Sequence, residues 1–330
     1  MKLQGLFSAL AAALLLTPSL AAPSAQPEPD ASTLDARDPS IPAGAGRPFN
    51  AAARPHKPVD TKYFKEPGGD DALGHYDNRY YTGTQVGYEE HRNTLRYLIR
   101  AYLTVFREHN IETWIAHGTL LGWWWNGKIM PWDPDLDVQV SASTLVWLGK
   151  NMNMTFHDYV GRSPSGEEVH RRYLLDINPN SAERVRGDGM NVIDARFIDT
   201  SNGMFIDITG LSETNPGSQP GVWSCKNYHR YRTRDLYPMR ETVFEGVPAT
   251  VPYSFDKILI EEYSQKALTT TSFHGHKWIA EKKEWVADEQ QQATMGRRKR
   301  SAEAIAPHVP RSIQVERSGT GLRNLKTLFT

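Results

Sequence analysis

The hydrophobic pattern divides the chain into a patterned middle and two unpatterned ends. Between about residues 61 and 287, aromatic and aliphatic residues are dense and no long Pro- or Gly-rich stretch interrupts them, which predicts one domain. Apolar residues recur at helical spacing from Leu95 to Phe106. This repeat predicts an amphipathic helix that packs on a core and ends near Asn110.

A short strand, a glycine turn and a second helix are predicted to follow. Thr113 to Ala116 is an apolar run typical of a buried strand, His117-Gly118-Thr119 predicts a tight turn, and Leu120 to Trp125 predicts the start of a helix. Such a turn brings a glycine and the free N–H groups of a helix N-terminus together. It is therefore typical of anion-binding sites.

Two acidic segments alternate with the period of a β-strand. In residues 133–140, Asp135 and Asp137 share one face while apolar residues share the other, and Ser141 or Ser143 is suited to cap a following helix. Further on, the apolar runs 192–198 and 204–209 are joined by a turn-rich connection that predicts a hairpin. Asp207 lies in the middle of the second run.

These elements predict an α/β (α+β) fold, with a mixed sheet flanked by helices in a single domain at residues 61–287. Residues 22–60, rich in Pro, Ala and Ser, predict a disordered linker or stalk. Residues 288–330 are polar and then basic, and predict a disordered tail. The formal net charge is zero, which gives no indication of a nucleic-acid partner.

The first 21 residues have the layout of a signal peptide. Lys2 precedes an apolar run that ends at Pro18, and small residues follow up to Ala21, where we expect cleavage. An uncleaved anchor is the alternative. We therefore expect a protein of the secretory pathway, in the Golgi lumen or secreted. Cys225 is the single cysteine, which excludes an intramolecular disulfide.

The candidate chemistry lies in three aspartates placed within strands. A carboxylate in the middle of a strand is unfavourable to desolvate unless a cation meets it. Asp135 and Asp137 are predicted to project from one face, where a divalent cation would relieve their repulsion, and Mg or Mn suits carboxylate and phosphate oxygens together. Asp207 is expected to complete this catalytic metal site, either as a third ligand or as the base that takes a proton.

The turn before this strand is predicted to hold a phosphate. Gly118 allows close approach of a phosphate to the backbone, and Thr119 adds a hydroxyl. His117 and Lys128 are further candidates for phosphate contacts, although a hydrogen-bonded structural histidine and a solvated lysine in a loop are the more common interpretations. A phosphate site on one side and a cation site on the other is the arrangement that phosphoryl transfer requires.

Other motifs give weaker indications. A basic segment interleaved with tyrosines, residues 226–234, could grip a pyrophosphate, but charged runs usually face solvent. Asp133 is either a turn residue or a second ligand. The pair His274 and His276 lacks further partners at zinc-site spacing. Walker, Gly-x-Ser-x-Gly and His-Glu-x-x-His motifs do not occur.

Several of these segments together resemble the LicD/fukutin family of the nucleotidyltransferase-like superfamily. They are His117-Gly118-Thr119-Leu120-Leu121-Gly122, Ile129 to Asp133, Asp135-Leu136-Asp137-Val138, Phe205-Ile206-Asp207-Ile208 and Val251-Pro252-Tyr253. Trp123 to Trp125 and the segment Gly221 to Lys226 are closer to the fungal branch that is associated with mannosylphosphate transfer to glycans.

The resemblance implies a nucleotidyltransferase-like fold and a metal-dependent phosphotransferase. The donor would be nucleotide-activated, GDP-mannose or a CDP-alcohol, and its distal phosphate would be attacked by a hydroxyl of a glycan or glycoprotein. Some fungal relatives are described as regulators, so a non-catalytic role beside a partner transferase is one alternative. A metal-dependent glycosyltransferase, which would move the sugar alone, is another.

Overall fold

The structure is a computed structural model that describes residues 61–288. The expected signal peptide (1–21), the linker (22–60) and all but the first residue of the tail (288–330) lie outside the described residues. Among the helices of residues 61–288, none combines the length and the apolar character that crossing a bilayer would need.

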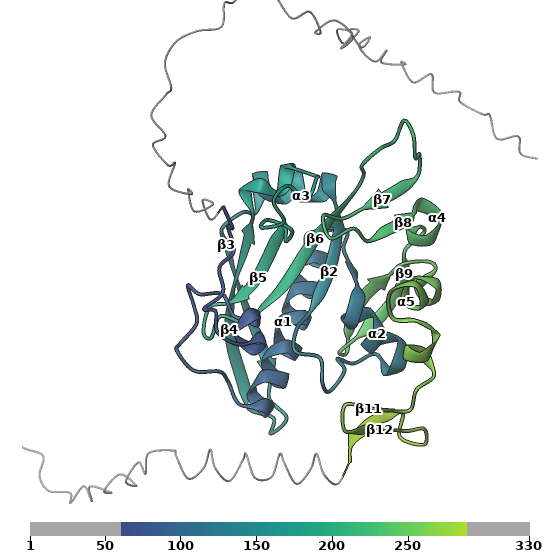
Figure 1. Cartoon of the computed structure of the whole chain (residues 1–330). Coiled ribbons are helices and arrows are strands. Elements are labelled where there is room, and N and C mark those ends of the chain that lie inside the picture. The colour runs from purple at the N-terminus through teal and green to yellow at the C-terminus, as the bar shows by residue number, and fades with distance from the viewer. Residues whose placement is uncertain (1–60, 289–330) are drawn as a thin grey trace, which may run out of the picture. The chain divides into compact units, whose positions relative to one another are not determined.

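A mixed β-sheet forms the centre of the domain (Figure 1). Its strands follow the order β1-β2-β6-β5-β4-β3, and β7 and β8 extend from the end of β6. β2 and β6 are parallel, and the other neighbours are antiparallel. The strands are β1 (Trp114–Ile115), β2 (Asp137–Ser141), β3 (Thr155–Arg162), β4 (Glu168–Ile177), β5 (Ala195–Asp199), β6 (Phe205–Glu213), β7 (Val222–Ser224) and β8 (Arg230–Arg232).

Helices and two small sheets surround this sheet. The α-helices are α1 (Tyr88–Glu108), α2 (His117–Asn126), α3 (Ala142–Asn151), α4 (Thr233–Leu236) and α5 (Phe255–Tyr263). Three 3₁₀ helices are η1 (Asp71–His75), η2 (Pro179–Ala182) and η3 (Gln265–Leu268). One small sheet pairs β9 (Arg240–Phe244) with β10 (Val247–Val251). The other has the order β11 (Ser272–Phe273), β12 (His276–Ile279), β13 (Glu284–Ala287), with β12 in the middle. The predicted fold class, a mixed sheet flanked by helices, is confirmed.

The strand period of two separates a core face of the sheet from a polar face. Val138, Phe197 and Ile206 point to the core face, where they pack with the apolar side of α1. Their neighbours in sequence, Asp137 and Asp207 among them, point to the other face. The polar side chains of the site therefore share one surface of the sheet.

Local signals explain several element boundaries. Ser141 caps α3, because its hydroxyl accepts a hydrogen bond from the backbone N–H of Thr144 at 3.0 Å. α1 ends at Glu108, and Asn110 follows it with a φ of 54°, the left-handed conformation that asparagine tolerates. The hairpin predicted from residues 192–209 is present as β5 and β6.

Two predicted boundaries are wrong. The strand expected over residues 133–140 begins only at Asp137, and residues 133–136 are irregular. Pro131 and Pro134 lack the backbone N–H that a ladder needs, which accounts for the late start. The turn expected at residues 117–119 is the first turn of α2, which begins at His117.

Candidate functional site

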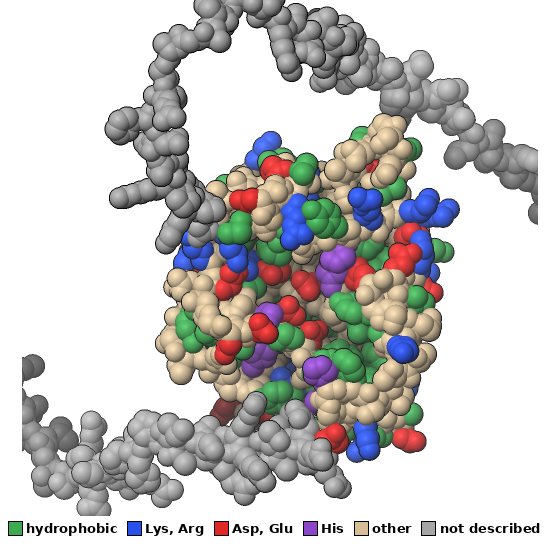
Figure 2. Space-filling model, viewed as in Figure 1, with side chains coloured by type: hydrophobic (Ala, Val, Ile, Leu, Met, Phe, Trp, Pro, Cys, Tyr) green, Lys and Arg blue, Asp and Glu red, His purple; other side chains and the backbone are tan. Residues whose placement is uncertain are grey.

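Four aspartates meet on the polar face of the sheet. Asp137 opens β2 and is paired in register with Asp207 of the adjacent parallel strand β6, so the two side chains lie on the same face. Asp133 and Asp135 join them from the irregular segment before β2, and all four influence one another electrostatically. Figure 2 shows acidic side chains, with histidines among them, in a hollow at the middle of this face.

Asp133, Asp137 and Asp207 have raised pKa values. Burial, with the charges of Asp135 and Asp137, raises the pKa of Asp133 to about 8. Burial likewise raises the pKa of Asp137 to about 7; His117 lowers it, while Asp135 and Asp207 add to the rise. Four partly buried carboxylates concentrate negative charge here, and all the atoms they offer to a cation are oxygens. This donor set fits Mg²⁺ or Mn²⁺.

Asp207 is also part of an ion-pair network beneath the site. The Arg196 guanidinium of β5 donates to Asp207 Oδ1 at 2.8 Å and to Glu66 Oε1 at 2.6 Å. Arg196 is almost fully buried and is covered by the rings of Phe64 and Phe205. Burial raises the pKa of Asp207, and Arg196 lowers it by less, so the net shift is upward. One oxygen of Asp207 is thus held by a cation.

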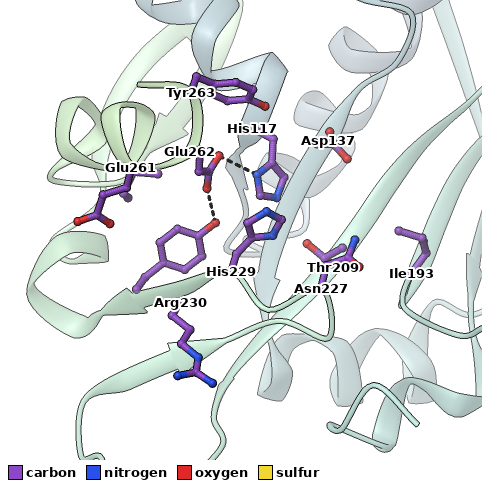
Figure 3. A pocket seen from close by; sticks show the side chains of 12 residues that line it. His117, Asp137, Ile193, Thr209, Asn227, His229, Arg230, Glu261, Glu262 and Tyr263 are labelled. Atoms are coloured by element: carbon purple, nitrogen blue, oxygen red, sulfur yellow. Dashed lines mark hydrogen bonds and ion pairs between the residues drawn. The ribbon is translucent and has the colours of Figure 1, made fainter. Parts of the chain in front are cut away.

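A histidine–glutamate pair borders the aspartates on the α5 side. His117 Nδ1 lies 2.9 Å from Glu262 Oε2, and the Tyr231 hydroxyl donates to Glu262 Oε1 at 2.8 Å (Figure 3). Burial lowers the pKa of His117, but Glu262, with Asp137 and Asp135, raises it by more, and the net shift is upward. The pair is therefore predominantly ionic over a wider pH range than a free histidine would allow.

His229 completes a second possible cation group with this pair. One ligand atom each of His117, His229 and Glu262 lie within 4.8 Å of one another. Each of these side chains already has a protein partner: His117 Nε2 lies 3.3 Å from the Gln139 amide nitrogen, and His229 Nδ1 lies 3.4 Å from the sulfur of Cys225. The group is accordingly satisfied as a hydrogen-bonded network.

A cavity of about 580 Å³ opens between these groups. Asp137, His117 and Glu262 line one part of it, and Thr209, Asn227 and Arg230 line another (Figure 3). Its walls come from β2, β6, α5 and the segment before β8, so strands and loops far apart in sequence converge here. The cavity is polar, contains both signs of charge and reaches the aspartates, which suits a phosphorylated ligand.

The residues of the predicted phosphate turn contact the aspartates. Thr119 Oγ1 accepts a hydrogen bond from the backbone N–H of Asp137 at 2.9 Å and so fixes the start of β2. A Cβ atom on Gly118 would lie 2.9 Å from Asp133 Oδ2, which is closer than real Cβ contacts. Gly118 thus makes room for this carboxylate. The phosphate contacts expected of Gly118 and Thr119 stay a prediction.

The other basic residues that were candidates for phosphate contacts have different surroundings in the structure. Lys128 is exposed and pairs with Glu284 at 2.8 Å, away from the aspartates. Lys226 is buried and pairs with Asp194 at 2.9 Å, so it supports the fold. Of the basic segment 226–234, His229 and Arg230 line the cavity.

Sequence reasoning missed two residues that organise the site. Arg196 could have been found, because the predicted hairpin register places it directly opposite Asp207. Glu262 carries no such signal: it lies near the end of α5, 145 positions after its partner His117 in the sequence. Only the tertiary packing of α2 against α5 brings them together.

Comparisons with known proteins place this geometry in a family. The model described as "LicD/FKTN/FKRP, nucleotidyltransferase domain" matches residues 110–254. Mannosyltransferase regulator 4 of Saccharomyces cerevisiae is 35% identical over 210 residues, 61% of this chain and 17% of that protein. Mannosyltransferase regulator 14 of the same yeast is 33% identical over 171 residues, 49% of this chain and 17% of that protein. The chain thus spans about a sixth of the length of these relatives. Residues 110–254, which include α2, β2 and Asp207, are thus similar to the LicD family nucleotidyltransferase domain.

Proposed function

We propose that this domain transfers a sugar phosphate, mannose phosphate from GDP-mannose, onto a hydroxyl of a glycan, in a reaction that depends on Mg²⁺ or Mn²⁺. The observation that carries the proposal is the register of Asp137 with Asp207 on adjacent parallel strands, with Asp133 and Asp135 beside them. The family match and the names of the yeast relatives support the link to mannose-containing glycans.

The four aspartates would hold the cation. Asp135 and Asp137 are the leading ligands, and Asp207 offers the oxygen that Arg196 does not bind. When bound, a divalent cation neutralises charge on the phosphates of a donor. Arg196 stabilises the charged form of Asp207, which favours a ligand role over that of a base.

The chemistry would be an in-line displacement at the distal phosphorus of the donor. The acceptor oxygen forms a new P–O bond, the bond from that phosphorus to the bridging oxygen breaks, and GMP leaves with the bonding electron pair. The acceptor proton passes to a carboxylate of the site. Asp133 is placed to take it, because it lies beside Asp135 and Asp137, and a cation bound there would lower its raised pKa and keep it ionised.

The nucleotide product tests this proposal. Purified protein would be incubated with GDP-mannose, Mn²⁺ and a mannose oligosaccharide, and nucleotides and glycans would be analysed by chromatography and mass spectrometry. We expect GMP and a phosphodiester-linked product, both lost in Asp137→Asn. Asp158→Asn is the matched control, since Asp158 lies in an exposed ion pair on β3. Release of GDP would point instead to a glycosyltransferase.

A second function has specific support. Both yeast relatives are named regulators, and the chain covers about a sixth of each. A non-catalytic regulator of mannosylphosphate transfer would bind a partner transferase. In that case the purified protein would release no GMP, and Asp137→Asn would leave glycan phosphorylation in cells intact. A lumenal location in the secretory pathway belongs to either proposal and rests on the signal-peptide pattern of residues 1–21.

A further inference from the structure

A second cavity, of about 450 Å³, has Asp133 in its wall. Gly118, which leaves room for the Asp133 carboxylate, lines it as well. Tyr263 lines this cavity and also the polar one, which Asp137 lines, so the two cavities adjoin at Tyr263. The remaining walls are mostly apolar and come from α2, from the segment before β2 and from the small sheet β11–β13.

Aromatic rings form the outer part of this second cavity. Trp132 lies edge-on to Phe273 and to Trp285, with ring centroids 5.3 and 4.9 Å apart. Trp125 packs on Trp285 at 4.8 Å, and its indole N–H donates to the backbone carbonyl of Ala267 at 3.1 Å. These contacts hold the aromatic side chains of the cavity wall in place. Phe273, in contrast, is 50% exposed and so leaves part of its ring open to a ligand.

The charges of the two cavities differ. The polar cavity carries His117, His229 and Arg230 beside its carboxylates. The aromatic cavity has one carboxylate, Asp133, and one ammonium group, Lys266, among apolar and aromatic side chains. A pyrophosphate would bring negative charge that the aromatic cavity cannot balance. An uncharged ligand with apolar faces and hydroxyl groups fits it better.

We propose that the aromatic cavity binds a sugar ring of the acceptor glycan, with the sugar ring stacked on the exposed face of Phe273 and its edge toward Trp132. This inference rests on the proposed function, since it names the binding site of the acceptor in that reaction. One hydroxyl of the bound sugar would point inward to Asp133, next to the aspartates. The donor phosphates would then occupy the polar cavity, so the two substrates meet at the acidic group from opposite sides.

The ring geometry favours a sugar over the base of a nucleotide. A flat base is held best between parallel ring faces, with polar partners along its edge. The walls here meet at steep angles: the Trp132 plane makes 62° with Phe273 and 85° with Trp285. A sugar ring needs one exposed aromatic face to pack on, with polar side chains nearby that bind its hydroxyl groups. Thr270 and the Lys266 ammonium offer such partners near the opening.

Binding of a free saccharide, without donor or turnover, tests the inference. Mannotetraose would be titrated into the full chain, and the intrinsic fluorescence of the wall tryptophans would report binding. We expect Phe273→Ala to weaken mannotetraose binding about tenfold, equal to about 1.4 kcal/mol. Phe273→Tyr, which keeps a ring, should retain most of the affinity. Binding of GDP-mannose with Mn²⁺ should be unchanged in both variants.

The control is Phe156→Ala on β3, because Phe156 is 55% exposed, close to the exposure of Phe273, and lies on the outermost strand of the large sheet. It should bind mannotetraose like the unchanged protein. The inference is overturned if mannotetraose does not bind, if Phe273→Ala binds it normally, or if that variant loses GDP-mannose instead. If the saccharide binds but the transfer assay releases no GMP, the proposed function alone is refuted. If GMP is released but the saccharide does not bind at Phe273, this inference alone is refuted.

Discussion

Replacement of Asp137 by asparagine should stabilise the metal-free protein at alkaline pH and abolish its stabilisation by Mn²⁺. The carboxylate is buried among Asp133, Asp135 and Asp207, and its pKa is about 7, whereas the ordinary value is 3.8. The folded state therefore binds this proton more tightly than the unfolded state does. An amide of the same shape removes the charge while keeping the packing.

The sign and size follow from this difference in pKa. Below about pH 4 the carboxyl group is protonated in both states, and its effect on stability is nil. Between about pH 4 and 7 the unfolded state loses the proton first, so the free energy of unfolding falls as pH rises, and above about pH 7 the full penalty is present. Each pKa unit is worth about 1.4 kcal/mol, which gives an upper bound of about 4 kcal/mol. This bound already includes the attraction of His117, and because Asp137 is only partly shielded from solvent we expect a net gain of about 2 kcal/mol.

Thermal unfolding measures the effect. In a chelator at pH 8, the melting temperature of Asp137→Asn should exceed that of the unchanged protein by about 4 to 8 °C, and at pH 4 the two should coincide. Mn²⁺ should raise the melting temperature of the unchanged protein at pH 8 and have little effect on the variant. A variant that melts below the unchanged protein at pH 8 would refute the electrostatic reasoning. A variant that keeps the full response to Mn²⁺ would refute the assignment of Asp137 as a ligand.

Three further substitutions probe the surroundings of the aspartates. Arg196→Leu leaves Asp207 without its cation and should lower the free energy of unfolding by about 3 kcal/mol in urea titrations, whereas Arg196→Lys should lower it less. Gly118→Ala places a methyl group against the Asp133 carboxylate; the fold should tolerate it, but Mn²⁺ affinity measured by calorimetry should fall about tenfold. Lys128→Ala removes an exposed ion pair, so stability should change by less than about 1 kcal/mol and GMP release by less than about twofold; a larger loss of GMP release would support a phosphate contact.

Much of the fold was predictable because its signals are local. The alternation around Asp207 required a strand, and the turn-rich connection before it required a hairpin. The cap at Ser141 and the left-handed residue after α1 are equally local. The strand expected at residues 133–140 was wrong because Pro134 outweighed the alternation. Asp135 thus approaches the site from a loop.

The rest of the site depends on contacts that a sequence does not display. The pair of His117 with Glu262 joins two helices far apart in the chain, and its existence depends on how α5 packs beside α2. The aromatic cavity likewise combines Trp132 with Phe273, from segments that show no shared period. The alternation of polar and apolar residues could predict which side chains face the site, but it could not predict which of those side chains contact one another.

The electrostatics of the aspartates also bear on the choice between enzyme and regulator. A surface that only binds a partner protein does not need partly buried carboxylates that raise one another's pKa. Each such carboxylate lowers the stability of the metal-free fold at neutral pH. Nor does it need Arg196, buried under two rings, to hold Asp207 in place. These features are expected where a cation is bound and released in turnover. The regulator hypothesis would instead have to explain why the domain maintains them at a cost in stability.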